Sequence, residues 1–386
     1  MKLGINASRA RSGGAYTHLT GLLSEAKPAT YGFSEVHLWA HAKLLESLPN
    51  YSWLHKHNFD KSEKSMGRQL LWERFELPKQ LNVNKCEVLL NIDAGSLCRF
   101  RPSVTMSRDM LSYEPGEMAR YGMSKAWLRL LSLKFVQNAS LRAATGVIFL
   151  TRYAGSIIQQ STGKLAQIAY IPHGVSDAFR RVKLKEPRQN QDNYRVKCLY
   201  VSNIAPYKHQ WHVVSAVKKL RDKGVNLGLT LTGGGAAAKA NDSMRRLNDA
   251  LDVADPNREF VQVLGYIDQK DLPDLLSQAD IFVFASSCEN MPNTLVEAMA
   301  TGLPIACSNR GPMPEMLDDG GVYFDPENCD SIASAIEELA LDPELRARNS
   351  ARARELSSPY SWSNCADRTF SFLADIGNSQ KGNGPS

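Results

Sequence analysis

The stretch 280–308, DIFVFASSCENMPNTLVEAMATGLPIACS, contains the unit that decides the fold. Residues 280–286 and 303–308 are short apolar runs with the composition of buried strands. Between them, Pro292 and Asn293 stand where a helix would begin. A strand, a helix and a second strand in this order predict a parallel β-sheet covered by helices.

The same alternation runs along the whole chain. The predicted strands are 2–7, 35–40, 87–92, 103–107, 146–151, 167–172, 196–202, 227–233, 260–266, 280–286, 303–308 and 321–324. The pattern is interrupted at 181–195, which is charged and polar and reads as a linker. We therefore predict an α/β fold of two doubly wound Rossmann-like domains that face each other across a cleft, with ligands at the carboxyl ends of the strands.

The predicted domain boundaries follow from the linker. The first domain covers 1–180, and the second covers 196–359. A helix at 360–377 is expected to return to the first domain, and 378–386 reads as a disordered tail because it is rich in Gly, Ser and Asn.

Composition indicates a soluble globular protein. The 386 residues are 43% hydrophobic and 22% charged, and no run approaches the roughly 20 apolar residues of a membrane-spanning helix. The start of the chain lacks the pattern of a secretory signal. Seven scattered cysteines without a CxxC pair favour a reduced, cytoplasmic protein over a disulfide framework or a zinc site.

Charge is distributed unevenly. Residues 1–180 hold 23 basic and 13 acidic side chains, whereas 181–386 hold 23 and 27. The segment 118–176 has seven bases and no acid, and its bases alternate with apolar residues around 118–142. This mixture favours a helix on an anionic membrane surface over a nucleic-acid groove. A buried helix whose bases extend to solvent is an equally good reading.

Two glutamates flank the start of the helix at 292–300. Glu289 follows the strand 280–286, and Glu297 lies one to one and a half turns inside the helix. The amino end of a helix suits a phosphate, while carboxylates suit hydroxyl groups on either side of it. Together they indicate a nucleotide-sugar. The alternative is that Glu289 caps the helix and Glu297 is solvated.

Other residues that follow strand ends could help to bind the nucleotide-sugar. Lys208 follows the strand 196–202 and could neutralise a departing phosphate. Gly233 belongs to a glycine run after the next strand, and Gly13 and Gly14 follow the first strand of the chain and open a helix. A solvated lysine and flexible loops are the alternatives.

Several chemistries are disfavoured by missing motifs. The chain has no GxxxxGK[ST] loop, no HExxH, no GxSxG and no DxD pair to hold a metal on a diphosphate, so no metal is expected. Four histidines near strand ends are read as structural; they are His18, His173, His209 and His212.

A set of motifs in a fixed order resembles the retaining nucleotide-sugar glycosyltransferases of family 4, which have the GT-B architecture. The matching stretches are GVIFLTRYA, IPHGVSDAF, YVSNIAPYKH, LTGGG, VLGYIDQKDLPDLLSQADIFVFAS, CENMPNTLVEAMATGLPIACSNRGPMPEML and YSWSNCADRTFSFL. They cover nearly the whole second domain and the ends of the first.

The resemblance implies roles for individual residues. Glu289 and Glu297 match the family's Glu-x7-Glu motif, so the first would contact the donor sugar and the second the ribose, while Lys208 would hold the diphosphate. Gly13 and Gly14 would border the phosphate or the acceptor. The remaining predicted donor-binding residues are Asn203, Gly233, Tyr266, Met291, Pro292, Asn293 and Thr294.

The chain departs from the family pattern at three places. Asn203 stands where the family usually has an arginine, and Asn290, Met291 and Pro292 replace glycines. In the first domain, Arg108 and Asp109 replace a histidine that commonly follows the fourth strand. We place this pair on the acceptor or phosphate side without a specific role.

The predicted reaction is metal-independent transfer of a sugar from a UDP- or GDP-linked donor to an acceptor hydroxyl, with retention at the anomeric carbon. The expected acceptor is a glycan or lipid-linked glycan of bacterial surface polysaccharide, such as O-antigen or capsule. No cofactor and no nucleic-acid partner are expected. We expect a cytoplasmic protein, with peripheral contact at the inner face of the plasma membrane. The alternatives are a GT-B sugar-nucleotide epimerase and a non-catalytic sugar-nucleotide binding protein.

Overall fold

The chain folds into two compact units. The computed structural model describes residues 1–10, 13–59, 66–183, 194–234 and 242–381. The first unit comprises Met1–Gly174 and the segment from Tyr360 onward, and the second comprises Val175–Pro359. Among the described residues, no helix combines the length and the apolar character that crossing a bilayer requires.

The first unit is built on a parallel sheet of seven strands. Their order is β3-β2-β1-β4-β5-β6-β7, so the sheet grows outward from β1 in both directions. The central strands are buried on both faces, which explains their continuous apolar runs. The strands are β1 (Lys2–Asn6), β2 (Glu35–Ala40), β3 (Leu54–Asn58), β4 (Val88–Asn91), β5 (Ser103–Ser107), β6 (Gly146–Phe149) and β7 (Ile168–Tyr170).

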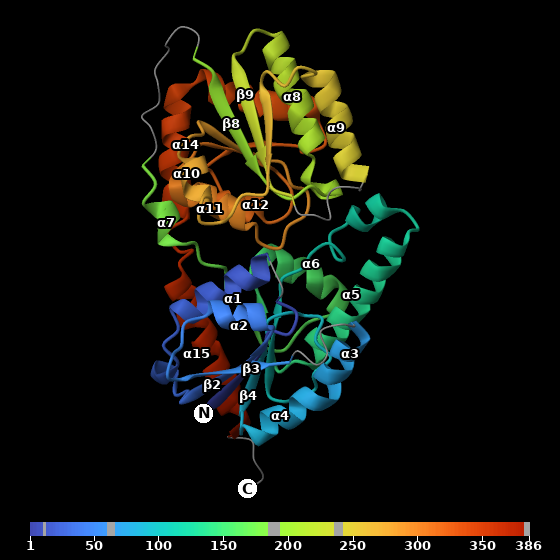
Figure 1. The fold of residues 1–386 in the computed structure, drawn as a ribbon, viewed down its shortest axis with the longest axis vertical. Helices are drawn as coiled ribbons and strands as arrows, with labels where there is room; N and C mark the ends of the chain where they lie inside the picture. Colours follow the sequence, from blue (N-terminus) through green and yellow to red (C-terminus); the bar gives the residue numbers. More distant parts are fainter. Residues whose placement is uncertain (11–12, 60–65, 184–193, 235–241, 382–386) are drawn as a thin grey trace. The chain divides into compact units, whose positions relative to one another are not determined.

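Helices cover this sheet, and one of them comes from the end of the chain. α15, red in Figure 1, packs on α1 and on the strands β4 and β5. Trp362 lies so close to Gly21 that a Cβ added there would be 2.3 Å from its ring. The helical segments are α1 (Gly14–Ser24), η1 (Pro28–Tyr31), α2 (Ala42–Ser47), α3 (Met66–Leu71), η3 (Trp72–Glu76), α4 (Leu77–Val83), η4 (Glu117–Tyr121), α5 (Lys125–Ala143), α6 (Arg152–Thr162) and α15 (Trp362–Lys381).

The second unit is built on a parallel sheet of six strands. The order is β10-β9-β8-β11-β12-β13, and it reverses between β8 and β11. The strands are β8 (Val196–Val201), β9 (Leu227–Thr232), β10 (Val261–Gly265), β11 (Ile281–Phe284), β12 (Ile305–Ser308) and β13 (Val322–Phe324). The helical segments are α7 (Asp177–Arg180), η5 (Pro206–Lys208), α8 (Gln210–Asp222), α9 (Asp242–Ala254), α10 (Leu272–Leu276), α11 (Asn293–Thr301), α12 (Met313–Leu317), α13 (Cys329–Leu341) and α14 (Pro343–Leu356).

The prediction of two doubly wound parallel sheets is confirmed. Every predicted strand is present, and each lies within its predicted bounds. The strand β3 was missed because its sequence, LHKHN, is polar and only Leu54 in it is buried. Such a composition is compatible with its place at the edge of the sheet.

The boundaries differ in detail from those expected. The division falls after Gly174 rather than at 180, because α7 contacts α11 of the second unit. Of the predicted linker 181–195, residues 184–193 lie outside the described part of the chain. The expected disordered tail at 378–386 is wrong for 378–381, since α15 continues to Lys381, anchored by the buried Leu373 and Ile376. Residues 382–386 lie outside the described range.

Candidate functional site

Four predicted residues follow neighbouring strands at the carboxyl edge of the second sheet. Tyr266 follows β10, Gly233 follows β9, Lys208 follows β8 and Glu289 follows β11. These four strands are adjacent in the sheet, and the order reverses between β8 and β11. A reversal of strand order leaves a crevice at the carboxyl ends, where ligands of such folds bind.

The centre of this edge is an ion pair. Nζ of Lys208 donates a hydrogen bond to Oε1 of Glu289. Lys208 is only 7% exposed, so its ammonium group requires a partner. Its backbone carbonyl accepts a hydrogen bond of 2.7 Å from the hydroxyl of Tyr200 on β8, which ties η5 to the sheet. The rings of Tyr207 and Phe284 lie 5.2 and 5.5 Å from Nζ.

The amino end of α11 follows the loop that carries Glu289. The helix begins at Asn293, after the N-cap Pro292, and Val296 donates a hydrogen bond of 3.2 Å to the carbonyl of Pro292. The N–H groups of Asn293 and Thr294 precede that bond and are free of intrahelical acceptors. The first turn contains no acidic residue, so its positive dipole end is not neutralised by the helix itself.

Glu297 is buried inside the same helix. Its side chain is 6% exposed, and its Oε1 accepts a hydrogen bond of 3.1 Å from Nε2 of Gln269. Burial raises the pKa of Glu297 to about 7, although the Gln269 hydrogen bond lowers it. The alternative of a solvated Glu297 and a helix-capping Glu289 is therefore wrong, because Glu297 is buried and Pro292 occupies the N-cap.

The other predicted donor-side residues differ in their surroundings. Gly233 has φ of +114°, and a Cβ there would lie 2.2 Å from the carbonyl oxygen of Ser202, so only glycine fits. The carbonyl of Asn203 accepts a hydrogen bond of 2.8 Å from Gln210. Met291 is buried, whereas Tyr266 is 70% exposed.

In the first unit, the predicted glycines stand at the start of α1. Gly13 is the N-cap with φ of +65°, a conformation that favours glycine, and Gly14 is the first helical residue. Residues 11 and 12, which precede them, lie outside the described part of the chain.

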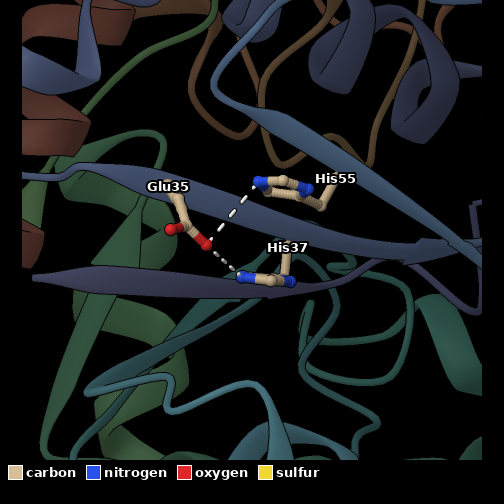
Figure 2. Close-up of side chains that lie close together, drawn as sticks. All are labelled: Glu35, His37 and His55. Carbon is tan, nitrogen blue, oxygen red and sulfur yellow. Dashed lines mark hydrogen bonds and ion pairs between the residues drawn. The ribbon is translucent and has the colours of Figure 1, made fainter.

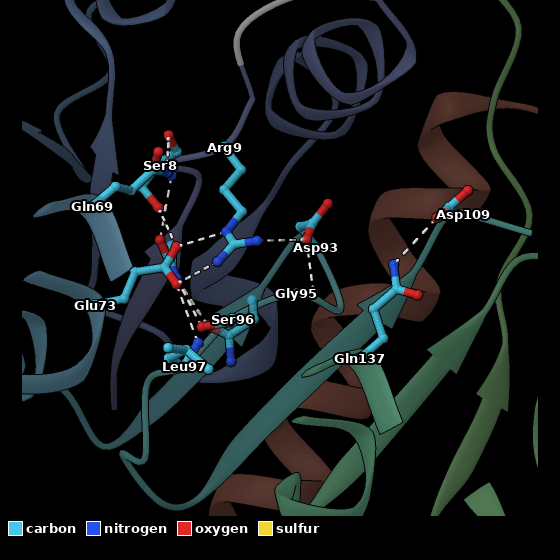
Figure 3. Close-up of polar contacts among 12 residues, drawn as sticks. Ser8, Arg9, Gln69, Glu73, Asp93, Gly95, Ser96, Leu97, Asp109 and Gln137 are labelled. Carbon is cyan, nitrogen blue, oxygen red and sulfur yellow. Dashed lines mark hydrogen bonds and ion pairs between the residues drawn. The ribbon is translucent and has the colours of Figure 1, made fainter. Parts of the chain in front are cut away.

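A salt-bridged network lies after β1 and β4, at the carboxyl edge of the first sheet. In Figure 3, the guanidinium group of Arg9 lies between Glu73 and Asp93. It donates to Glu73 at 3.0 and 3.1 Å, and its Nη1 is 3.9 Å from Asp93. Burial lowers the pKa of Arg9, but the hydrogen bond to the fully buried Glu73 and the charges of Glu73 and Asp93 together outweigh burial, so the pKa is raised. Our sequence reasoning missed this network, because Glu73 lies in η3 and is distant in sequence from its partners.

Arg108 and Asp109 follow β5. Nε and Nη1 of Arg108 are buried, and they have no hydrogen-bond partner among the described residues. Burial lowers the pKa of Arg108 to about 10, so the group stays charged at pH 7. Burial raises the pKa of Asp109, whose Oδ2 is 3.4 Å from Nε2 of Gln137 (Figure 3). Buried guanidinium nitrogens without hydrogen-bond partners are costly, and an anionic ligand would offset that cost.

Two of the four histidines read as structural form a buried pair near Arg108. Nδ1 of His18 on α1 lies 2.6 Å from Nδ1 of His173, which follows β7. Burial, together with the charge of Arg108, lowers the pKa of both rings well below its ordinary value. Both are therefore neutral at pH 7, and one ring donates to the other.

Comparisons with known proteins agree with this fold. Residues 182–356 match the model of the family described as "Glycosyl transferases group 1". The chain is 28% identical over 261 residues to the O-antigen chain mannosyltransferase B of Escherichia coli, covering 67% of this chain and 65% of that protein. It is 27% identical over 243 residues to a GDP-mannose-dependent alpha-(1-6)-phosphatidylinositol monomannoside mannosyltransferase of Mycobacterium tuberculosis, covering 59% and 61%. In both relatives, less than two thirds of the length is matched.

Solved structures with the GT-B fold resemble the chain over nearly its whole length. The sucrose-phosphate synthase of Thermosynechococcus elongatus superposes with a TM-score of 0.75, at 17% identity, covering 98% of this chain and all of that one. The α,α-trehalose 6-phosphate synthase of Burkholderia multivorans gives a TM-score of 0.71 at 12% identity, covering 100% and 98%. At such identities the likeness concerns the fold.

Proposed function

We propose that this chain is a glycosyltransferase that uses a nucleotide-diphosphate sugar. Residues 182–356 match the glycosyl transferases group 1 family, which supports this proposal. The observation that carries the proposal is the buried ion pair of Lys208 and Glu289. It lies where the strand order reverses, on the loops after β8 and β11, and the second loop leads into the amino end of α11. A cation, a helix terminus and a carboxylate at one edge suit a phosphate flanked by hydroxyl groups.

In the proposed complex, the diphosphate takes the place of Glu289 as the partner of Lys208. The first-turn N–H groups of α11 would bind the same anion. Glu289 is then free to accept hydrogen bonds from the donor sugar, and Glu297 accepts them from the ribose. A ligand hydroxyl at Glu297 favours the charged carboxylate and would lower its pKa from about 7.

The proposed transfer retains the anomeric configuration and needs no metal. The bond between the anomeric carbon and the diphosphate oxygen breaks as the acceptor oxygen attacks from the same face. The acceptor proton passes to the departing phosphate oxygen, whose growing charge Lys208 and the helix terminus stabilise. The preorganised Lys208 is the residue whose removal affects this step most.

Relatives favour a mannosyl donor as the first candidate. One relative is named an O-antigen chain mannosyltransferase, and another is named GDP-mannose-dependent. We accordingly propose GDP-mannose as the donor and a growing bacterial surface glycan as the acceptor. UDP-linked sugars are the alternative donors.

The acceptor side is proposed to lie in the first unit. Nε and Nη1 of Arg108 are buried and have no hydrogen-bond partner in the described part of the chain, so they suit an anionic group, such as a phosphate that links a glycan to its lipid. Asp109 beside it, and Gly13 and Gly14 at the start of α1, would border the same acceptor.

Peripheral contact with an anionic membrane is proposed for α5. Leu128 and Phe135 on this helix are 57% and 68% exposed, and Met123 just before it is 96% exposed. Of the 19 residues of the helix, only Gln137, Asn138, Ser140 and Leu141 are buried. This argues against the alternative of a buried helix whose bases extend to solvent. Exposed apolar side chains beside Lys125 and Arg129 suit the interface of an anionic bilayer.

Product analysis tests the proposal. The purified chain is incubated with GDP-mannose, UDP-glucose or UDP-galactose and a lipid-linked glycan acceptor, after a thermal-shift screen has ranked the nucleotides. We expect one donor to raise the melting temperature and to give a glycoside with the donor's anomeric configuration in NMR spectra. Donor turnover without acceptor would indicate an epimerase, and donor binding without any turnover would indicate a binding protein.

A further inference from the structure

A cluster of histidines with one glutamate lies on β2 and β3, away from the residues proposed for transfer. Glu35 and His37 are two residues apart on β2 and therefore point to the same face of the sheet. His55 on β3 pairs with His37 in the register of the two strands. Figure 2 shows the three side chains turned toward one another.

The distances within the cluster match the spacing of metal ligands. Nε2 of His37 is 3.2 Å from Oε2 of Glu35, and Nε2 of His55 is 3.6 Å from the same oxygen. One ligand atom from each residue lies within 4.8 Å of the others, and this is the only such group of three among the residues that the structure describes. Zinc bonds of about 2.0–2.1 Å in a tetrahedron separate neighbouring ligand atoms by roughly 3.3 Å. Two of the three pairs thus already have nearly the required separation.

The third pair requires a rotation of one ring. The imidazoles of His37 and His55 are stacked at 18° with their centroids 4.8 Å apart, whereas a shared ion must lie near the plane of each ring. The side chain of His55 is 46% exposed and can turn, while that of His37 is 6% exposed. The buried ring therefore sets the position of the ion, and the exposed ring adjusts to it.

A third histidine, His57, supports the buried His37. Nδ1 of His37 lies 3.0 Å from Nε2 of His57, so a proton on Nδ1 leaves Nε2 of His37 free to coordinate.

Lys2 would compete with a metal ion for the carboxylate of Glu35. Its Nζ donates a hydrogen bond of 2.8 Å to Oε2 of Glu35, so an ammonium group now occupies part of the space that a metal ion would take. The side chain of Lys2 is 31% exposed and can swing into solvent. A divalent ion would then replace a single positive charge at the carboxylate.

We propose that Glu35, His37 and His55 form a binding site for one Zn²⁺ ion, with a water molecule as the fourth ligand. Two imidazoles and a carboxylate suit zinc and its neighbours among the transition metals better than Mg²⁺ or Ca²⁺. The ion would bridge β2 to the polar edge strand β3, in the amino-terminal half of both strands. Its role is structural, and it is independent of the sugar transfer proposed at the carboxyl edges.

Calorimetric titration of the full chain with Zn²⁺, after dialysis against a chelator, tests the site. We expect one equivalent to bind, and we expect His55→Gln to weaken binding more than tenfold. Lys2→Met should tighten binding severalfold, because it removes the competing ammonium. His212→Gln on α8 removes a histidine from the other unit and should leave the affinity unchanged.

Extended X-ray absorption of the zinc-loaded wild type gives a readout that does not depend on how the variants fold. Two imidazole ligands are expected. The proposal is overturned if no imidazole is found, if His55→Gln binds as the wild type does, or if His212→Gln loses as much affinity. Equal or weaker binding by Lys2→Met would contradict coordination through Oε2 of Glu35.

Discussion

Lys208 and Glu289 form an ion pair that joins the loops after two neighbouring strands, β8 and β11. The side chains of the two residues are 9% and 15% exposed, so neither charge is fully hydrated. Removing one residue of such a pair destabilises the protein, because the charge of the other residue is left unpaired. The diphosphate of a nucleotide-sugar could replace the carboxylate without leaving the ammonium group unpaired.

Lys208→Ala should lower kcat for sugar transfer by about 10²–10³, the usual cost of removing one preorganised group that stabilises transition-state charge. Steady-state kinetics with the donor found by the screen measure this loss. Lys223→Ala, which removes a lysine that is 61% exposed at the end of α8, should leave kcat unchanged. Equal kinetics for wild type and Lys208→Ala would contradict the proposed role.

Glu289→Ala should destabilise the ligand-free protein by about 3 kcal/mol, because it leaves the ammonium group of Lys208 buried and unpaired. Nucleoside diphosphate should then raise the melting temperature of the variant more than that of the wild type. The measurement is thermal unfolding with and without the nucleotide. A smaller shift in the variant would show that the diphosphate does not reach Lys208.

The raised pKa of Glu297 predicts that the stability of the protein depends on pH. Its pKa is raised from 4.5 to about 7 by burial, so the folded state binds the proton more tightly than the unfolded chain does. The stabilisation is complete below pH 4.5 and is lost as the pH rises to about 7. Relative to Glu297→Gln, the wild type should lose on the order of 3 kcal/mol between these values. Urea unfolding at several pH values measures the difference, and parallel curves for the two proteins would contradict it.

Arg108 and Arg9 should respond in opposite ways to the same substitution. Arg108→Met removes a charge whose buried Nε and Nη1 have no hydrogen-bond partner among the described residues, so it should stabilise the ligand-free protein by about 1 kcal/mol while reducing kcat/KM for the acceptor. Arg9→Met leaves the carboxylate of Glu73 buried without its opposite charge, although Ser8 and Leu97 still donate hydrogen bonds to it, and should cost about 3 kcal/mol. Thermal unfolding and acceptor kinetics measure the two effects. A destabilised Arg108→Met with normal acceptor kinetics would remove the proposed anion site.

Leu128→Glu combined with Phe135→Glu should abolish co-sedimentation with vesicles that contain anionic lipid, because both side chains are exposed on α5. The matched control is Val253→Glu on α9, whose side chain is 76% exposed. We expect the control to bind vesicles as the wild type does. Sedimentation of the double variant at the wild-type level would exclude α5 as the contact.

The sequence was sufficient to place Lys208 and Glu289 at the carboxyl ends of two predicted strands. Each follows an apolar run that reads as a parallel strand, and parallel strands end at the same edge of a sheet. The sequence did not predict the partners of Glu297 and Arg9. Gln269 and Glu73 lie in a loop and in the π-helical segment η3, and their positions depend on how those segments pack. The sequence pattern also could not locate β3, since an edge strand needs few apolar residues.

α15 places residues from the end of the chain in the first unit, where it packs on α1, β4 and β5. During synthesis on a ribosome, every residue of the continuous second unit, 175–359, is added before Trp362. Until α15 has been made, the first unit lacks the helix that packs on α1, β4 and β5, and Gly21 lacks the ring of Trp362 that lies against it. The first unit, whose synthesis begins first, is therefore completed after the second unit.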